Sequence, residues 1–258
     1  MVLFVPSSPS PRCVFSPFLS TVPNAVAAFS CRMGGVSPAP YGSLNLSFGV
    51  GDTDENVREN RQRLKAALGI PVLASAKQVH GDRVWVIDAP LAQDTEEAGY
   101  DALVTNQPGV ALMVQQADCQ AVLLHDSVRN VVAAIHAGWR GSVANIIAKT
   151  IQTMVERFGT NPADVVAGIS PSLGPCCAEF INYRAELPAE FHGHQVTSNH
   201  FDFWAISRDQ LVAAGVREEQ IETARICTKC SPDYFSFRRE RVTGRFGSVI
   251  MLQEAVSV

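Results

Sequence analysis

The 258-residue sequence lacks several features that define large classes of proteins. It has no long run of basic residues and its formal net charge is −4, so we do not expect it to bind nucleic acid. It has no apolar run long enough to cross a bilayer, and its proline-rich first thirty residues lack the basic start of a secretory signal. We therefore expect a cytoplasmic protein whose seven cysteines stay reduced and take part in metal or thiolate chemistry, not in structural disulfides.

No internal repeat or linker of biased composition is visible, which favours a single α/β domain with a mixed sheet after an irregular leader over residues 1–25. Helical periodicity predicts three helices. The first follows Asp52 and ends at Gly69, the second runs from about Ser142 to Phe158, and the third covers 205–214. The nearly continuous apolar runs at 121–124 and 131–136 indicate strands covered on both faces. Further strands are predicted at 84–87, 101–105, 110–115, 165–169, 224–227, 234–237 and 246–251.

Three short stretches carry the strongest chemical signal: Lys77–Gly81 (KQVHG), Ala117–Cys119 (ADC) and His136–Gly141 (HAGWRG). Each places one metal-binding side chain beside a strand-like run: His80, Cys119 and His136. Two imidazoles and a thiolate from separate segments are the ligands that a catalytic zinc site with one open position uses, and they also suit copper. The pattern therefore predicts a metal-dependent enzyme that acts on a small molecule.

The same residues permit a different chemistry. Cys119 could be a nucleophile with His136 as its base, and Asp118 or His80 could orient the pair, as in cysteine hydrolases. Taken singly, each histidine could also be a satisfied core residue, and Cys119 could be a small buried apolar side chain. Arg140 stands at a helix start after a glycine turn, where it could bind an anion or form a structural ion pair.

Four further cysteines fall into two pairs, Cys176 with Cys177 and Cys227 with Cys230. They invite the idea of a structural zinc, but adjacent cysteines seldom chelate one ion well. We therefore expect these four residues to be buried or mildly reactive thiols.

Additional motifs connect the sequence to a known family: Phe29–Ser37 (FSCRMGGVS), Ser43–Leu46 (SLNL), Val50–Asp52 (VGD), Val57–Arg61 (VRENR), Gly174–Cys177 (GPCC), Phe235–Arg239 (FSFRR) and Thr243–Arg245 (TGR). Together with the three stretches above, they make the chain resemble the multicopper polyphenol oxidoreductase (laccase-domain) proteins. Members of this family are also described as YfiH-type purine nucleoside phosphorylases, and some bacterial members as peptidoglycan editing factors. The resemblance runs from about residue 29 to the C-terminus.

The resemblance implies one catalytic laccase-type domain over residues 26–258, with mixed sheets flanked by helices in an α/β (α+β) fold related to that of certain cysteine-dependent toxin deamidases. It implies that His80, Cys119 and His136 hold zinc, that Arg32 belongs to the active site, and that Ser43 and Asn45 line the adjoining substrate loop. The implied activities are phosphorolysis of adenosine, inosine, guanosine and methylthioadenosine, and deamination of adenosine. The partners would be a purine nucleoside and phosphate, with the protein a monomer or homodimer.

For phosphorolysis, Arg32 and Arg140 are the candidate phosphate ligands, because a planar guanidinium meets two phosphate oxygens at once. For deamination, Asp118 could transfer protons, or it could merely orient a neighbouring group. A laccase function is poorly supported, because the chain has six histidines and only one His-X-His pair, at His192 and His194. Copper could still occupy the site of His80, Cys119 and His136 adventitiously, because such ligands bind it tightly. An amide hydrolase that edits peptidoglycan precursors and a metal-binding protein without catalytic activity remain as alternatives.

Overall fold

The structure is a computed structural model that describes residues 11, 13–15 and 24–253. Most of the expected irregular leader over residues 1–25 lies outside the described residues. The described part of it includes a short strand, β1 (Cys13–Phe15), which pairs with β2 (Ala25–Ser30). None of the described helices combines the length and apolar character that crossing a bilayer requires.

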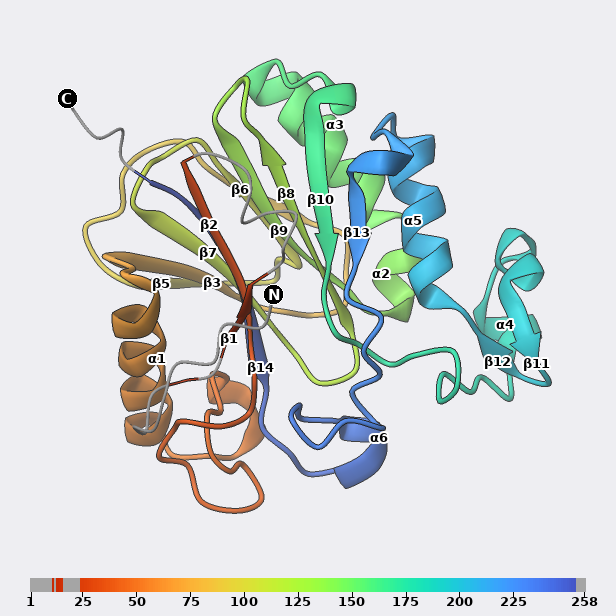
Figure 1. Cartoon of the computed structure of the whole chain (residues 1–258), viewed down its shortest axis with the longest axis horizontal. Coiled ribbons are helices and arrows are strands. Elements are labelled where there is room, and N and C mark those ends of the chain that lie inside the picture. Colours follow the sequence, from red (N-terminus) through yellow and green to blue (C-terminus); the bar gives the residue numbers. More distant parts are fainter. Residues whose placement is uncertain (1–10, 12, 16–23, 254–258) are drawn as a thin grey trace.

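Two six-stranded sheets and one two-stranded sheet are formed by the described residues (Figure 1). The first sheet has the order β1, β2, β14 (Phe246–Leu252), β7 (Val110–Gln116), β3 (Val72–Lys77) and β5 (Thr95–Ala98). The second sheet has the order β13 (Ile221–Thr223), β10 (Val165–Ile169), β8 (Gln120–Asp126), β9 (Val131–Ala137), β6 (Ala102–Thr105) and β4 (Val84–Ile87). Strands β11 (Gln195–Thr197) and β12 (His200–Phe201) form the small sheet. Parallel and antiparallel pairs occur in both large sheets, which confirms the predicted mixed α/β architecture.

Helices cover the outer faces of the two large sheets. The described α-helices are α1 (Asp54–Leu68), α2 (Trp139–Val143), α3 (Ile146–Phe158), α4 (Tyr183–Glu186), α5 (Phe203–Ala213) and α6 (Phe237–Glu240). Helix α1 packs on the first sheet through Leu64 and Leu68, whereas α3 and α5 pack on the second sheet (Figure 1). The order of layers is therefore helix, sheet, sheet, helices.

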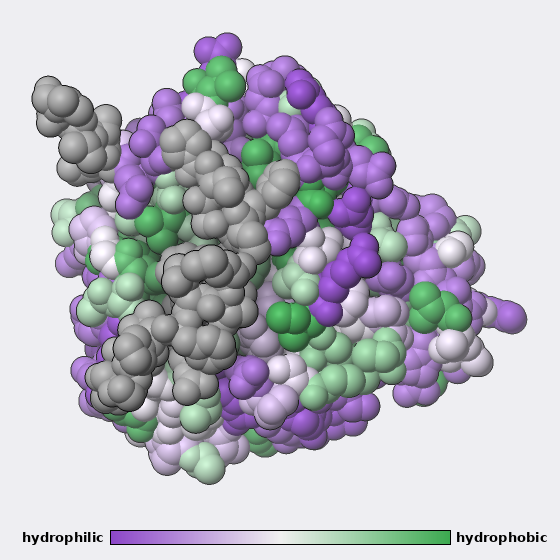
Figure 2. Space-filling view, in the orientation of Figure 1, coloured by the Kyte–Doolittle hydropathy of each residue, from purple (hydrophilic) through white to green (hydrophobic). Residues whose placement is uncertain are grey.

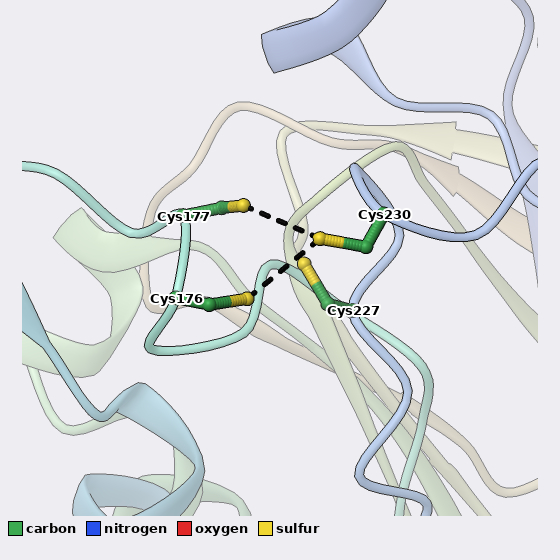
Figure 3. Close-up of side chains that lie close together, drawn as sticks. All are labelled: Cys176, Cys177, Cys227 and Cys230. Carbon is green, nitrogen blue, oxygen red and sulfur yellow. Dashed lines mark hydrogen bonds between the residues drawn. The ribbon is translucent and has the colours of Figure 1, made fainter.

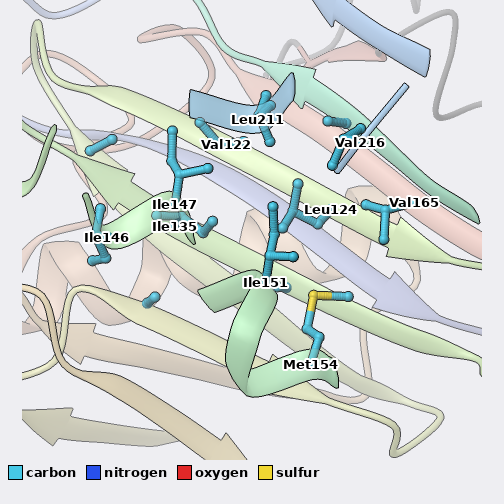
Figure 4. Packing of buried hydrophobic residues seen from close by; sticks show 14 of the residues in the cluster. Val122, Leu124, Ile135, Ile146, Ile147, Ile151, Met154, Val165, Leu211 and Val216 are labelled. Carbon is cyan, nitrogen blue, oxygen red and sulfur yellow. The ribbon is translucent and has the colours of Figure 1, made fainter. Parts of the chain in front are cut away.

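Alternating side chains of the central strands fill the two cores on either side of the second sheet. In β8, Leu123 points between the two sheets, while Val122 and Leu124 point toward α3 and α5. From α3, Ile151 and Met154 close this outer core (Figure 4). Both faces of β8 and β9 are covered, which confirms the prediction that the apolar runs at 121–124 and 131–136 are strands buried on both sides.

The start of the long predicted helix differs from the structure. We expected one helix from Ser142 to Phe158, but α2 ends at Val143 and α3 begins at Ile146. Asn145 separates them in the left-handed region, with φ 54°, and its side chain accepts a hydrogen bond from the Ala148 backbone N–H. The apolar periodicity continues across this break, so it could not reveal the new helix cap.

Two predicted strands are wrong. Residues 224–227 contribute only an isolated bridge between Ser172 and Cys227. Residues 234–237 form a loop that buries Tyr234 and Phe235 and leads into α6, where the Ser236 side chain caps the helix. A short aromatic run has the same composition in a buried loop as in a strand, which explains the error at 234–237. At 224–227 the strand β13 (Ile221–Thr223) ends just before the predicted segment.

The surface of the face seen in Figure 2 is mixed in character, because strongly hydrophobic residues stand there in small groups among hydrophilic ones. The chemistry-bearing residues meet instead at one end of the second sheet, where β8 begins and β9 ends. Strand pairing places Ala121 opposite His136 at this end. The sheet thereby brings motifs that are distant in the sequence into one neighbourhood.

Candidate metal centre

The three side chains predicted as metal ligands converge. His80 lies in the loop after β3, Cys119 directly precedes β8, and His136 lies in β9. Their ligand atoms all lie within 4.8 Å of one another, and the Cys119 Sγ is 3.8 Å from the His80 Nε2. We call these three residues the His/Cys/His cluster. Their arrangement could hold a metal ion.

Asp101 directly precedes β6 and organises the cluster, although no motif in the sequence pointed to it. Its buried carboxylate accepts hydrogen bonds from three consecutive backbone N–H groups, at Val79 (3.2 Å), His80 (2.9 Å) and Gly81 (2.8 Å). It also lies 2.9 Å from the Nδ1 of His136. This contact directs the opposite ring nitrogen of His136 toward the cluster, as carboxylates that hydrogen-bond to a metal-binding histidine do in metal sites.

The charges within the cluster are strongly coupled. Burial raises the pKa of the Cys119 thiol, but the neighbouring His136 and His80 outweigh it and lower this pKa to about 6. Burial lowers the pKa of His136, but the Cys119 thiolate and Asp101 outweigh it and raise this pKa to about 9. At neutral pH the thiol is therefore ionised, and thiolate is the form that binds metal ions and attacks electrophiles.

Gly138 provides the space in which the three ligands meet. A Cβ at this position would lie 2.9 Å from the His80 Cδ2 and 3.2 Å from the Cys119 Sγ. Its φ of −72° is ordinary, so the requirement for glycine here is one of space and not of backbone conformation. Gly138 of the HAGWRG motif therefore leaves room for the side chains of the His/Cys/His cluster.

The cluster opens into a cavity of about 870 Å³, which is large enough for a small organic ligand. Aromatic side chains form part of its wall, among them Trp139, Phe180 and Phe203. The Phe180 and Phe203 rings lie 5.1 Å apart between centroids. The cavity therefore combines a polar, metal-ligating end with flat apolar surfaces.

Two arginines also line this cavity, Arg238 and Arg245. The Arg245 guanidinium donates to the backbone oxygens of Thr243 (2.9 Å) and Gly244 (3.0 Å), and none of the described carboxylates forms an ion pair with it. Burial lowers the pKa of Arg245, while the charges of Cys119 and Asp118 raise it. Arg245 stood in the TGR motif, but nothing in the sequence placed it nearer to the cluster than Arg32 or Arg140.

Three residues expected at the substrate site lie outside the wall that the described residues give this cavity. Arg32 forms an ion pair with Glu240 (2.6 Å) and stacks on Phe235 (4.6 Å). The Ser43 hydroxyl accepts a hydrogen bond from a backbone N–H 3.1 Å away, and Asn45 is fully buried. These residues shape the loop that leads from β2 to α1.

Asp118 and Arg140 also have defined surroundings. Asp118 lines the cavity, but both of its carboxylate oxygens accept hydrogen bonds, from the Thr228 hydroxyl (2.7 Å) and the Arg238 backbone N–H (2.6 Å). Arg140 is exposed and stacks on Trp139 at 4.2 Å, and it is absent from the described cavity wall. Asp118 thus ties the residue before Cys119 to Thr228 and Arg238.

The sequence matches the family model described as multi-copper polyphenol oxidoreductase laccase over residues 26–253. The chain belongs to this family. A Streptomyces griseus member, named purine nucleoside phosphorylase ORF3, is 38% identical over 236 residues, which cover 89% of this chain and 95% of the relative. The Escherichia coli (strain K12) protein named purine nucleoside phosphorylase YfiH is 35% identical over 263 residues, which cover 97% and 98% of the two chains.

Solved structures agree with this assignment. The Bacillus licheniformis hypothetical protein YfiH matches with a TM-score of 0.84 and 29% identity, covering 95% of this chain and 97% of that one. YlmD from Geobacillus stearothermophilus matches with a TM-score of 0.83 and 32% identity, covering 93% and 94%. The resemblance found in the sequence motifs is thus confirmed at the level of family and fold.

The polyphenol oxidoreductase family name implies several copper ions, and the donor sets of this chain can be compared with that requirement. Among the described residues, histidine ligands gather in a metal-sized group only in the His/Cys/His cluster. His192 and His194 lie in a separate 3-10 helix (Ala189–His194), where His194 contacts Asp209 at 3.3 Å. One imidazole–thiolate–imidazole set fits one ion of zinc or copper.

Proposed function

We propose that this chain is a zinc-dependent purine nucleoside phosphorylase that accepts adenosine, inosine, guanosine and methylthioadenosine. The names of its relatives support the reaction class. The observation that carries the proposal is the joint presence, in one cavity, of the His/Cys/His cluster, an arginine without a carboxylate partner among the described residues, and an aromatic wall. The arginine matches the phosphate, the aromatic wall matches the purine, and a metal ion in the cluster could polarise an oxygen of either substrate.

His80, Cys119 and His136 would hold the zinc ion. A zinc ion at this position would supply a Lewis acid that polarises an oxygen of the substrate or phosphate. The chain itself keeps the ligands ready, because Asp101 fixes the His136 ring and the backbone that carries His80. Cys119 needs no further activation, since its pKa is already lowered to about 6.

Arg245 would bind the phosphate, with Arg238 on the same wall. A guanidinium can donate two hydrogen bonds to one phosphate, and in a partly enclosed cavity these charge-assisted bonds are strong. The bound phosphate would attack C1′ of the ribose, and the bond from C1′ to the purine nitrogen would break. The electron pair leaves with the base, which takes up a proton, and the products are ribose 1-phosphate and free purine.

The aromatic wall would bind the base. Trp139, Phe180 and Phe203 present flat rings at the cavity, and an offset stack with a purine is favourable by about 0.5–1.5 kcal/mol per ring contact. Stacking reads the shape of a purine more than its substituents. This supports a substrate range that includes both amino- and oxo-purines.

We propose adenosine deamination as a second activity of the same cavity. Water would replace the amino group of the base, so that adenosine gives inosine and ammonia. Because both Asp118 oxygens accept hydrogen bonds from Thr228 and Arg238, we assign Asp118 a positioning function beside Cys119.

One observation favours an alternative function, a cysteine-type amide hydrolase for peptidoglycan precursors. Cys119, His136 and Asp101 form a chain in which a low-pKa thiol neighbours a histidine that is oriented by a carboxylate. This is the arrangement of a cysteine nucleophile, its base and an orienting acid. Asp101, and not Asp118 or His80, would take the orienting position in this alternative.

Product analysis separates the two functions. The zinc-loaded protein is incubated with adenosine with and without phosphate, and in parallel with an amide-containing cell-wall precursor. Phosphate-dependent ribose 1-phosphate, seen by phosphorus NMR, supports the phosphorylase, and inosine supports the deaminase. Release of amine from the precursor by protein that carries no metal supports the hydrolase. Full zinc loading with neither ribose 1-phosphate nor inosine would refute the leading proposal.

Variants sharpen this test. Arg245→Met should raise the KM for phosphate at least about tenfold, because it removes a charge-assisted bidentate contact while keeping most of the side-chain volume. Arg157→Met is the matched control, since Arg157 lies near the end of α3, pairs with Asp88, and neither of these residues lines the cavity. An equal effect of the two variants on this KM would count against Arg245 as the phosphate ligand.

A further inference from the structure

A second group of ligands stands apart from the His/Cys/His cluster. Cys176 and Cys177 lie on the loop that follows β10, and Cys227 and Cys230 lie on a turn that follows β13. All four Sγ atoms lie within 4.8 Å of one another, and the four side chains point toward a common centre (Figure 3). We call these residues the cysteine cluster.

The spacing of the sulfur atoms is that of metal ligands and not of disulfides. The Sγ of Cys230 lies 3.8 Å from that of Cys176 and 3.6 Å from that of Cys177. A tetrahedral zinc ion with bonds of about 2.3 Å separates its sulfur ligands by about 3.8 Å, whereas a disulfide brings them to about 2.05 Å. None of the four cysteines is in a disulfide. Both adjacent cysteines reach the same partner, which answers the sequence-based objection to chelation by neighbours.

The backbone of the Cys227–Cys230 turn is held in place without a metal. The N–H groups of Cys230 and Ser231 donate to the Cys227 carbonyl, at 3.2 and 2.9 Å. The Arg239 guanidinium donates to the carbonyl oxygens of Thr228 (2.7 Å) and Lys229 (3.0 Å). The two sulfur atoms of this turn are therefore presented on one side before any ion binds.

The other loop is fitted closely against this turn. A Cβ at Gly174 would lie 2.8 Å from the Trp204 ring and 3.0 Å from the Cys227 Cβ, so only glycine allows the close approach. Ser172 pairs with Cys227 in an isolated bridge, where the Thr228 N–H donates to the Ser172 carbonyl at 3.0 Å. The two loops, which are some fifty residues apart in sequence, are thus joined on both sides of the cluster.

Four thiols this close cannot all ionise without a cation. All four Sγ atoms lie within 4.8 Å of one another, so thiolates at these positions would repel each other strongly. A divalent ion would remove the repulsion between thiolates and stabilise all four in the ionised form.

We propose that Cys176, Cys177, Cys227 and Cys230 form a second metal site, a closed tetrahedral site for structural zinc. With four protein ligands it has no open position, so it would contribute to folding rather than to chemistry. Iron–sulfur clusters place their cysteine ligands on different iron atoms, which requires a wider separation than this compact group gives.

The position of the cysteine cluster assigns it a role at the cavity. The loop and turn that carry it contact Asp118, which directly precedes Cys119. The Leu173 N–H donates to the Asp118 carbonyl (2.8 Å), and the Thr228 hydroxyl donates to its carboxylate (2.7 Å). Arg238, which lines the cavity, donates to the Cys177 carbonyl at 3.4 Å. Zinc at this site would clamp the cavity wall to the segment that positions Cys119.

The test uses the full chain with Cys119→Ser, which removes the thiolate of the His/Cys/His cluster and leaves the cysteine cluster intact. We expect one zinc per chain by elemental analysis, and X-ray absorption that shows four sulfur ligands at about 2.3 Å. Cobalt(II) substitution should give the visible bands of a tetrahedral four-thiolate site. Cys31→Ala, outside both clusters, is the matched control and should keep the metal content of the wild type.

Three results would overturn the proposal. The first is folded Cys119→Ser protein with no metal and four cysteines that react freely with a thiol reagent. The second is zinc bound through nitrogen and oxygen in that variant. The third is a folded Cys176→Ser, Cys230→Ser double variant that binds as much zinc as its parent. Each readout counts or identifies metal ligands, so the answer is independent of whether the chain proves to be a phosphorylase.

Discussion

Replacing Asp101 by asparagine tests how the His/Cys/His cluster is organised. The change keeps the shape of the side chain and replaces one of two carboxylate oxygens by an NH₂ group. One oxygen accepts from the His80 N–H and contacts the His136 Nδ1, and the other accepts from the N–H groups of Val79 and Gly81. Whichever oxygen is replaced, two of the four contacts lose their acceptor.

The expected magnitude follows from this count. The backbone donors lie on a partly exposed loop, where each lost hydrogen bond costs about 0.5–1.5 kcal/mol, so two losses should lower the free energy of unfolding of the metal-free protein by about 1–3 kcal/mol. Loss of a carboxylate behind a metal-ligating histidine lowers metal affinity roughly 10- to 100-fold. We therefore expect Asp101→Asn to weaken zinc binding by about this factor, even where the protein remains folded.

Urea unfolding of metal-depleted protein measures the first effect, and zinc competition with a chelator measures the second. Asp126→Asn is a matched control, because Asp126 is equally buried but lies at the other end of β8, and its Oδ2 has no partner among the described residues. The amide can occupy that position, so the control should keep its zinc affinity. Unchanged zinc affinity in Asp101→Asn, or an equal loss in Asp126→Asn, would refute the role given to Asp101.

Two further predictions concern space and charge at the same cavity. Gly138→Ala should weaken zinc binding at the His/Cys/His cluster roughly tenfold by displacing His80 and Cys119, whereas Gly193→Ala, with open space around its Cα, should leave the metal Kd unchanged. Competition with a chelator for zinc compares the two variants, under conditions in which the cysteine cluster keeps its zinc. Glu96 should stabilise the fold mainly at neutral pH: burial raises its pKa, but the ion pair with Arg61 (2.6 Å) lowers it by more. A lowered pKa means stabilisation that is complete above the unfolded value of about 4.3 and is lost as pH falls through the folded value. Urea unfolding from pH 7 to 3 should show that Glu96→Gln lowers the free energy of unfolding at neutral pH and that this loss shrinks below pH ~4.3. A loss that is the same at every pH, or an equal loss for the exposed Glu97→Gln, would contradict this.

Much of the fold could be predicted because local signals coincided with burial. The strands at 84–87 and 165–169 and the helix ending at Gly69 have the predicted bounds, since apolar runs and capping residues act over a few positions. Strands β2 and β3 were missed because small alanine and serine side chains weaken their apolar signal, and β5 was missed because Glu96 and Glu97 give it a charged and not an apolar centre. The left-handed Asn145 was invisible for a different reason, because it interrupts the helix without interrupting its apolar stripe.

The sequence by itself determined which side-chain types the candidate metal centre offers, since histidine and cysteine beside buried strands are chemically distinctive wherever the chain carries them. Only the tertiary structure decided which charged residues line the cavity into which the His/Cys/His cluster opens. Arg32, Arg140 and Arg245 look alike in sequence, but Arg32 pairs with Glu240, Arg140 stacks on the surface, and Arg245 lines the cavity. The same holds for Asp101 and for the four cysteines near the cavity, which act through neighbours distant in the chain. Side-chain chemistry is local, whereas partnership depends on how strands pair and loops pack, and that information is spread over the whole fold.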